Sequence, residues 1–356
     1  MHCLRDRLGL SVKVLEAGGG VGGTWYWNRY PGARCDSESH VYWYTFSQEL
    51  MREWEWSERY PGQAEILRYL NFAADRLDLK RDIRFNSRVV SAQYEEAGNR
   101  WRVRTEQGET FTATFLVTAV GCLSTANVPG IPGLRDFKGD WYHTGQWPHD
   151  GVDFSGKRVG MIGTGSTGIQ AAPVIAAQAS HLTVFQRTAN YSVPARNVPL
   201  TPEFKQYVRQ NARQIRATTR QTYNGMGFTV DERKAVETSP GRREEIYEAA
   251  WQRGGLQFRA VFQDMLVSKE ANDTAADFIK RKIRSVVKDP ATAAILSDID
   301  HPYAAKRPPI DSDYFETYNR PNVTLVDVKA SPIQSISEAG ICTAEAEYPV
   351  DIIVFA

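Results

Sequence analysis

A glycine-rich run, Gly163-Thr-Gly165-Ser-Thr-Gly168, constrains the fold of this chain more than any other feature. It follows an apolar stretch at 157–163 that is typical of a buried strand, and it opens a helical pattern at 167–178. Glycines at these spacings permit a tight turn and let a pyrophosphate contact the N–H groups at the helix N-terminus. A further strand at 181–187 completes a βαβ unit. The run therefore predicts an α/β fold that binds a dinucleotide through Gly163, Thr164, Gly165, Ser166 and Gly168.

The end of the strand at 181–187 indicates which dinucleotide is bound. The strand ends in Gln186-Arg187, whereas an NAD site places an acid there to bind the ribose 2′-hydroxyl. A cation at this position instead pairs with a 2′-phosphate. The pattern predicts NADP(H), with Gln186 and Arg187 among its contacts.

An earlier strand, at 11–16, ends in Glu16, where an acid would bind the adenosine ribose of a second dinucleotide. A solvated glutamate at a strand end is an equally simple interpretation, because no glycine fingerprint precedes it. The apolar run at 115–120 predicts a buried core strand. We expect two Rossmann-like dinucleotide-binding domains, 1–125 and 126–356. Helical patterns at about 199–300, with Ser239 and Asn272 as N-cap candidates, predict an insertion in the second.

Charge and cysteine content exclude several other classes of protein. Lys and Arg number 43 and Asp and Glu 42, so the formal charge of +1 gives no reason to expect nucleic acid or an anionic membrane as a partner. No apolar run approaches the ~18 residues of a membrane helix. The start MHCLRDRLGL is too charged for a secretory signal, so we expect a soluble, cytoplasmic protein. The scattered cysteines predict neither disulfides nor a metal site: Cys3, Cys35, Cys122, Cys342.

A longer motif places the chain in a family. The stretch FKGDWYHTGQWP at 137–148 resembles the FxGxxxHxxxWP signature of Baeyer–Villiger monooxygenases. The blocks GGTWYWNRYPGARCD, FQRT and AAKRPPIDSDYFETYNRPNV also look like family blocks, in family order. This resemblance covers essentially the whole chain. It implies that 1–125 is an incomplete FAD-binding domain and that 126–356 is the NADP-binding domain.

The resemblance also implies a reaction and roles for individual residues. In the family NADPH reduces FAD, O₂ adds at flavin C4a, and the resulting peroxide attacks a ketone to give an ester or lactone. Arg307 corresponds to the active-site arginine and Asp36 to the acid beside the flavin. The signature residues Phe137, Gly139, His143 and Trp147 couple domain movement to catalysis. The other cofactor contacts that it implies are Glu16, Thr24, Trp25, Tyr26, Trp27, Arg34, Tyr42, Val89 and Lys306.

Other interpretations remain open from the residues alone. Without the family blocks, Asp36 and Arg307 are more simply interpreted as a structural ion pair or as two unrelated surface charges. The aromatic residues 25–27 are compatible with turn packing, and His143 with a structural histidine. A related flavin monooxygenase that oxygenates N or S atoms, or a non-catalytic NADP-binding remnant, are the alternative functions. Family members have a strand and glycine fingerprint ahead of the matching region and a long segment after it, so we expect this chain to bind NADPH better than FAD. Sequence leaves the ketone, the regiochemistry and the oligomeric state open.

Overall fold

The computed structural model describes residues 1–222 and 225–356, which divide into two compact units. Unit 1 comprises Met1–Arg29 and Gln63–Ala126, and unit 2 comprises Tyr30–Gly62 and Asn127–Ala356. The segment Tyr30–Gly62 thus belongs with the second unit, although the expected domain limits of 1–125 and 126–356 placed it in the first. The assignment of FAD to residues 1–125 and of NADP to residues 126–356 stays a prediction.

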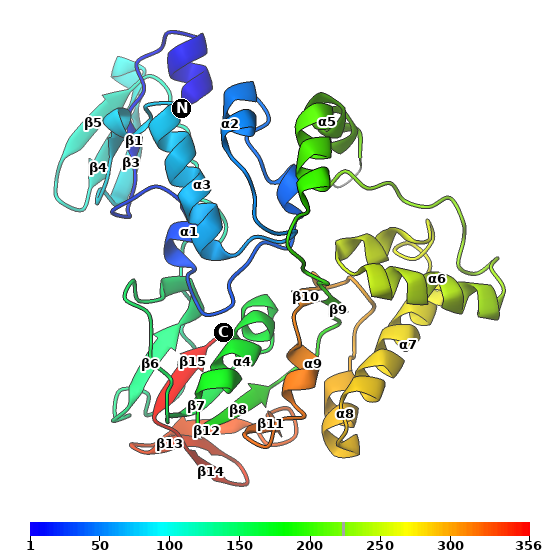
Figure 1. Ribbon diagram of the computed structural model, residues 1–356. Helices are drawn as coiled ribbons and strands as arrows, with labels where there is room; N and C mark the ends of the chain where they lie inside the picture. Colours follow the sequence, from blue (N-terminus) through cyan, green and yellow to red (C-terminus); the bar gives the residue numbers. More distant parts are fainter. Residues whose placement is uncertain (223–224) are drawn as a thin grey trace. The chain divides into compact units, whose positions relative to one another are not determined.

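Unit 1 contains two small sheets and a long helix, drawn in blue and cyan in Figure 1. Only the last part of the strand predicted at 11–16 is extended, and Val14 pairs in parallel with Ile83. The other sheet is an antiparallel meander in which Gly108, with φ of +83°, makes the last turn. The strands and α-helices are β1 (Val14–Leu15), α1 (Thr24–Trp27), α3 (Gln63–Arg76), β2 (Ile83–Arg84), β3 (Val89–Glu95), β4 (Arg100–Thr105) and β5 (Thr110–Ala113). Three short helical turns accompany them: η1 (Cys3–Arg7), η3 (Lys80–Asp82) and η4 (Glu96–Gly98).

The buried core strand predicted at 115–120 is not present. Within the described range 114–125 no residue belongs to a strand, and Phe115 is 81% exposed and Val120 74% exposed. A strand forms only where a neighbouring strand satisfies its N–H and C=O groups, and in the structure no described strand pairs with this run. Apolar character alone therefore gave a wrong prediction here.

Unit 2 is centred on a sheet of five parallel strands in the order β11-β8-β7-β15-β6 (Figure 1). Strand β15, which lies between β7 and the edge strand β6, is buried along its whole length, because strands flank it on both sides and apolar side chains cover both faces. This sheet confirms the predicted α/β fold. Its strands are β6 (Asp140–His143), β7 (Arg158–Ile162), β8 (His181–Gln186), β11 (Val323–Asp327) and β15 (Ile352–Phe355).

Shorter elements surround this sheet. Helix α4 (Ser166–Gln178) connects β7 to β8 and packs against both strands. A small antiparallel sheet lies between β11 and β15 in the chain. The remaining elements outside the insertion are η2 (Ser39–Val41), α2 (Gln48–Glu53), η5 (Thr144–Gln146), α9 (Tyr314–Thr317), β12 (Ile333–Ile336), β13 (Gly340–Thr343) and β14 (Glu347–Pro349).

Between β8 and β11 the chain makes the predicted helical excursion, which occupies residues 202–297. It leaves through β9 (Val193–Pro194) and returns through β10 (Ile310–Asp311), and these two short strands pair in parallel. Asn272 does not cap a helix, because Ser268 caps α7 by accepting from Ala271 N–H. The insertion contains α5 (Pro202–Gln221), α6 (Pro240–Arg253), η6 (Leu256–Ala260), α7 (Lys269–Val286) and α8 (Pro290–Ser297).

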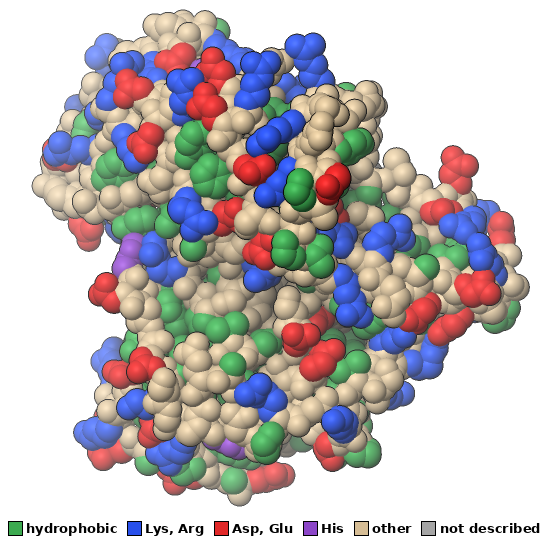
Figure 2. All heavy atoms as spheres, in the orientation of Figure 1, with side chains coloured by type: hydrophobic (Ala, Val, Ile, Leu, Met, Phe, Trp, Pro, Cys, Tyr) green, Lys and Arg blue, Asp and Glu red, His purple; other side chains and the backbone are tan. Residues whose placement is uncertain are grey.

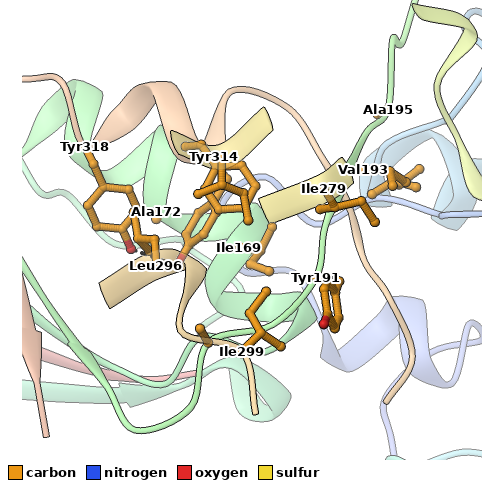
Figure 3. Close-up of a cluster of buried hydrophobic side chains, with 14 of the residues drawn as sticks. Ile169, Ala172, Tyr191, Val193, Ala195, Ile279, Leu296, Ile299, Tyr314 and Tyr318 are labelled. Atoms are coloured by element: carbon orange, nitrogen blue, oxygen red, sulfur yellow. Dashed lines mark hydrogen bonds between the residues drawn. The ribbon is translucent and has the colours of Figure 1, made fainter. Parts of the chain in front are cut away.

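The core of unit 2 is continuous between the sheet layer and this insertion. In Figure 3, Ile169 and Ala172 of α4 lie close to Tyr314 and Leu296, and Ile279 of α7 lies beside Val193. All of these side chains are buried. The insertion therefore shares one buried cluster with α4, so it holds the segments that enter and leave it in fixed positions.

The surface is mixed in charge. On the face drawn in Figure 2, basic and acidic side chains of the described residues are interspersed, as the near-zero net charge predicts. Among the helices formed by residues 1–222 and 225–356, none is both long and apolar enough to cross a membrane.

Candidate functional site

The glycine run forms the turn between β7 and α4. Gly163 has φ of +116°, and a Cβ there would lie 2.2 Å from the carbonyl oxygen of Ala356. At Gly168 a Cβ would lie 2.5 Å from the Gly163 oxygen. These two glycines are needed for the tight turn itself.

Gly165 differs from its neighbours in the turn. A Cβ at Gly165 would meet no described atom within 4 Å, and no described side chain caps α4 at this residue. The first turn of α4 therefore has N–H groups without a side-chain cap and space beside Gly165, as a phosphate site requires. Thr164 is buried and donates its hydroxyl to the Thr188 oxygen at 3.1 Å, which ties the turn to the segment after β8.

The two residues at the end of β8 have different surroundings. Arg187 is exposed, and β8 runs parallel to β7, so this cation and the glycine turn lie at the same edge of the sheet. Gln186 is buried, and its amide donates to the Ile295 oxygen on α8 at 3.2 Å. Lys306, the second predicted cation, is exposed on the segment that returns from the insertion. Of these three predicted contacts, Arg187 and Lys306 present exposed charges, whereas the Gln186 amide is bonded within the fold.

Asp36 and Arg307, which are 271 positions apart, form an ion pair. The Arg307 Nε and Nη2 atoms lie 2.9 and 2.5 Å from Asp36 Oδ2. The guanidinium side chain is 64% exposed, whereas the Asp36 side chain is 21% exposed. Because the pair is open to solvent, it contributes little to folding stability. Among the described residues, the hydrogen bonds to this carboxylate reach only Oδ2, so its second oxygen and the exposed guanidinium face are available to a ligand.

The loop that carries Asp36 is fixed to α4. Tyr30 donates its hydroxyl to Gln170 Oε1 at 2.8 Å, and the Gln170 amide donates to the Arg34 oxygen at 3.2 Å. A Cβ at Gly32 would lie 2.2 Å from the Gln170 oxygen, so the loop backbone lies directly on the helix. Sequence reasoning missed Gln170. Its signal was a polar residue in a helix that is otherwise rich in small and apolar side chains.

The Arg34 side chain bonds to residues of its own segment, Tyr30–Gly62. Its Nη1 donates to the Tyr60 oxygen at 3.0 Å and lies 3.5 Å from Glu58 Oε1. Tyr42 follows η2 on the same loop and is half-buried. The predicted cofactor role of these two residues stays a prediction.

The signature motif spans the edge strand of the sheet, β6, and the turns on either side of it. Phe137 and Trp147 are buried, and a Cβ at Gly139 would lie 2.2 Å from the Asp351 oxygen, so the motif fits β6 tightly beside β15. His143 Nδ1 accepts from Gly145 N–H at 3.0 Å, and burial lowers the pKa of this imidazole. The next residue, Thr144, contacts the Thr167 hydroxyl in the first turn of α4 at 3.3 Å. The end of the motif thus lies at the same helix terminus as the glycine turn.

The candidate residues of unit 1 form a group of their own. Glu16 Oε1 accepts from Gly18 N–H at 2.7 Å, so the carboxylate supports its own turn. Tyr26 Oη accepts from Gly19 N–H at 3.1 Å, and its ring packs against the glycines at 18–20. Thr24, Trp25 and Trp27 complete α1, and Gln63 Nε2 donates to the Trp25 oxygen at 2.5 Å. Val89 begins β3 and is 43% exposed. Much of this group is thus explained by turn packing, and its contact with a cofactor stays a prediction.

Titratable and cysteine side chains add one unexpected feature. Within residues 1–222 and 225–356 no cluster of three His, Cys, Asp or Glu side chains could hold a metal ion. The four cysteines are free thiols.

Asp311 is a buried carboxyl at the β9–β10 junction, where it accepts a hydrogen bond from the Ser192 hydroxyl at 2.6 Å. Burial raises the pKa of this carboxyl to about 7.

Replacing Asp311 with asparagine is expected to flatten the dependence of stability on pH. The folded protein keeps the Asp311 proton up to about pH 7, while the unfolded chain releases it near pH 4. The folded state therefore binds more protons between these values, and the parent loses stability as pH rises through this window. From pH 4 to pH 8, the parent should lose on the order of 2–4 kcal/mol more free energy of unfolding than Asp311→Asn. Urea denaturation at several pH values measures this, with the exposed neighbour Asp313→Asn as control; parallel curves for all three proteins would contradict it.

Comparison with known proteins gives the family. Residues 40–278 match the model of the pyridine nucleotide-disulphide oxidoreductase family. A Baeyer–Villiger monooxygenase of Pseudooceanicola batsensis is 48% identical over 100% of this chain, which spans 65% of that relative. The solved structure of an oxidized steroid monooxygenase bound to NADP is 53% identical, with a TM-score of 0.95 over 99% of this chain and 67% of its own. OTEMO in complex with FAD and NADP is 43% identical, with a TM-score of 0.96 over 99% and 68%.

The chain thus spans about two thirds of the length of the proteins it matches, at identities far above those that indicate a shared fold alone. The glycine turn, the signature strand and the Asp36–Arg307 pair all lie in the part of the chain that aligns with the Pseudooceanicola batsensis relative. This chain belongs to the pyridine nucleotide-disulphide oxidoreductase family and, within it, to the Baeyer–Villiger monooxygenases.

Proposed function

We propose that the protein carrying this chain is an FAD- and NADPH-dependent monooxygenase that converts a ketone into an ester or lactone with O₂. The observation that carries the proposal is the Asp36–Arg307 ion pair, on a loop fixed to α4 through Gln170. The N-terminus of the same helix carries the glycine turn. An activating charge pair and a dinucleotide turn are therefore attached to one helix.

The residues around the glycine turn fit NADP(H). The space at Gly165 and the uncapped first turn of α4 would hold the pyrophosphate. The exposed cations Arg187 and Lys306 would pair with the 2′-phosphate. Two solved relatives are bound to NADP, which supports this cofactor.

The Asp36–Arg307 pair fits a flavin-dependent oxygenation. FAD, when bound, accepts the hydride of NADPH and supplies the activated oxygen. Arg307 would stabilise the negative charge that develops on oxygen as the ketone reacts, because its planar guanidinium is permanently charged. Asp36 would orient the guanidinium through the two short contacts to Oδ2 and balance its charge. A solved relative that holds both FAD and NADP supports the pairing of cofactors.

The proposal is tested by product analysis. The full-length protein should be supplied with FAD, NADPH, ¹⁸O₂ and a panel of cyclic, linear and aryl ketones, and the products identified by mass spectrometry. We expect an ester or lactone that contains one ¹⁸O atom. NADPH-dependent oxidation of amines or thioethers without any ester would favour the heteroatom-oxygenating alternative. NADPH binding without flavin binding would favour the non-catalytic remnant. Cytoplasmic location stays a prediction.

Replacing Arg187 with alanine is expected to weaken the preference for NADPH over NADH. Arg187 is exposed at the end of β8 and would lose its pairing with the 2′-phosphate, which NADH lacks. We expect KM for NADPH to rise about 10- to 100-fold, as the loss of a charged hydrogen bond implies, while KM for NADH stays within about twofold. Steady-state NAD(P)H oxidation measures both constants. Arg320→Ala is the control, because Arg320 is an exposed arginine at the opposite end of the strands; equal rises for both cofactors would count against the assignment.

A further inference from the structure

Glu38, two residues after Asp36, accepts an unusual number of hydrogen bonds. Its Oε1 lies 3.1 and 2.7 Å from Nε and Nη2 of Arg59, and 3.0 Å from the Gln257 amide nitrogen. The Tyr60 hydroxyl is 3.5 Å away, and His40 Nδ1 lies 3.4 Å from Oε2. The side chains of Glu38 and Arg59 are each 17% exposed. A carboxylate with this many donors in a largely enclosed place is held in one position.

These donors come from two parts of unit 2. Arg59 and Tyr60 lie near the end of Tyr30–Gly62, whereas Gln257 lies on η6 in the helical insertion. Arg59 also donates from Nη1 to the oxygen of Arg253, the last residue of α6, at 2.7 Å. Glu38 therefore joins the loop of Asp36 to the insertion through one carboxylate oxygen.

Backbone contacts show that the loop is shaped around this point. Ser39 N–H donates to the Arg59 oxygen at 2.8 Å, and Cys35 N–H donates to the Pro61 oxygen at 3.1 Å. These two bonds lie on either side of Asp36 and Glu38. Gly255, with φ of +79°, lets the insertion approach closely, because a Cβ there would lie 2.0 Å from the Tyr60 hydroxyl. The segment 35–39, which contains Asp36, is thus held by two backbone hydrogen bonds and by the side chain of Glu38.

We propose that Glu38 is a positioning residue that holds Asp36, and through it Arg307, in place by tying the loop of Asp36 to the helical insertion. This inference rests on the proposed function for its catalytic consequence. Asp36 contacts Arg307 through Oδ2 alone, so a small shift of the loop would lengthen both short contacts. The glycine turn is reached through Gln170 instead, so a change at Glu38 leaves the dinucleotide turn supported.

The variant Glu38→Gln in the full-length protein tests the inference. Glu237→Gln is the control, since among the described residues exposed Glu237 pairs with Lys234 alone. We expect the ester formed per NADPH consumed to fall at least fivefold, while the rate of NADPH consumption changes less than twofold. A merely structural role would lower both quantities together. Gln257→Ala, which removes the direct hydrogen bond from the insertion to Glu38, should give a change in the same direction.

Hydrogen exchange measured by mass spectrometry gives a second readout that needs no cofactor. In Glu38→Gln, amides at 35–39 should exchange about tenfold faster, while amides of α7 keep the parent rate. Three results would each overturn the inference: unchanged exchange at 35–39, equal acceleration in α7, or a parent-like yield of ester per NADPH in both Glu38→Gln and Gln257→Ala. If the parent makes no ester, the proposed function fails, and the exchange result still decides whether Glu38 ties the loop.

Discussion

Replacing Arg307 with alanine is expected to reduce ester formation at least 100-fold while NADPH still reduces the flavin. The guanidinium is 64% exposed and is bound to Asp36, so its loss removes a fixed positive charge without opening a cavity in the core. Removal of one preorganised donor to a developing negative charge typically costs about 10²–10³ in rate. Hydride transfer depends on the dinucleotide turn instead, so bleaching of the flavin absorbance should proceed at near the parent rate. Stopped-flow absorbance and product analysis measure the two steps separately.

The matched control is Arg307→Lys. Lysine keeps the positive charge but loses the planar fork that lets Nε and Nη2 reach one carboxylate oxygen. We expect an intermediate ester yield, and melting temperatures of both variants within a few degrees of the parent, because exposed ion pairs contribute about 0–1 kcal/mol. An unimpaired ester yield in the alanine variant would remove Arg307 from the proposed reaction.

The local features of unit 2 could be predicted from the sequence because they depend on near neighbours. A glycine with positive φ at Gly163, an apolar strand before it and a helix after it are properties of a short stretch of chain. Three helices of the insertion, α5, α6 and α7, likewise follow from their sequence pattern, and α7 buries a stripe that includes Ala275, Phe278 and Ile279. Sequence pattern was sufficient for these elements.

Contacts between distant segments could not be predicted in the same way. No periodicity relates Asp36 to Arg307, and only the family resemblance suggested that they act together. Gln170 and Glu38 carried no motif, yet they hold the loop on both sides of Asp36. The run at 115–120 failed for the opposite reason, since apolar residues predict burial but do not supply the partner strand that a sheet needs.

The last prediction concerns the glycine turn, in which we expect Gly163 to be needed for folding and Gly165 for binding NADPH. Gly163→Ala is expected to lower the free energy of unfolding by about 3 kcal/mol or more, because it combines a positive φ with a Cβ 2.2 Å from the Ala356 carbonyl oxygen. Gly165→Ala is the matched comparison, since its φ is −78° and its Cβ would be unobstructed. That variant should unfold like the parent in urea but bind NADPH at least tenfold more weakly, because the methyl group fills the space proposed for the pyrophosphate. Chemical denaturation and fluorescence titration with NADPH give the two quantities. Parent-like NADPH affinity in Gly165→Ala would mean that the dinucleotide does not lie at the N-terminus of α4, and the proposed arrangement of cofactor and charge pair on one helix would then be wrong.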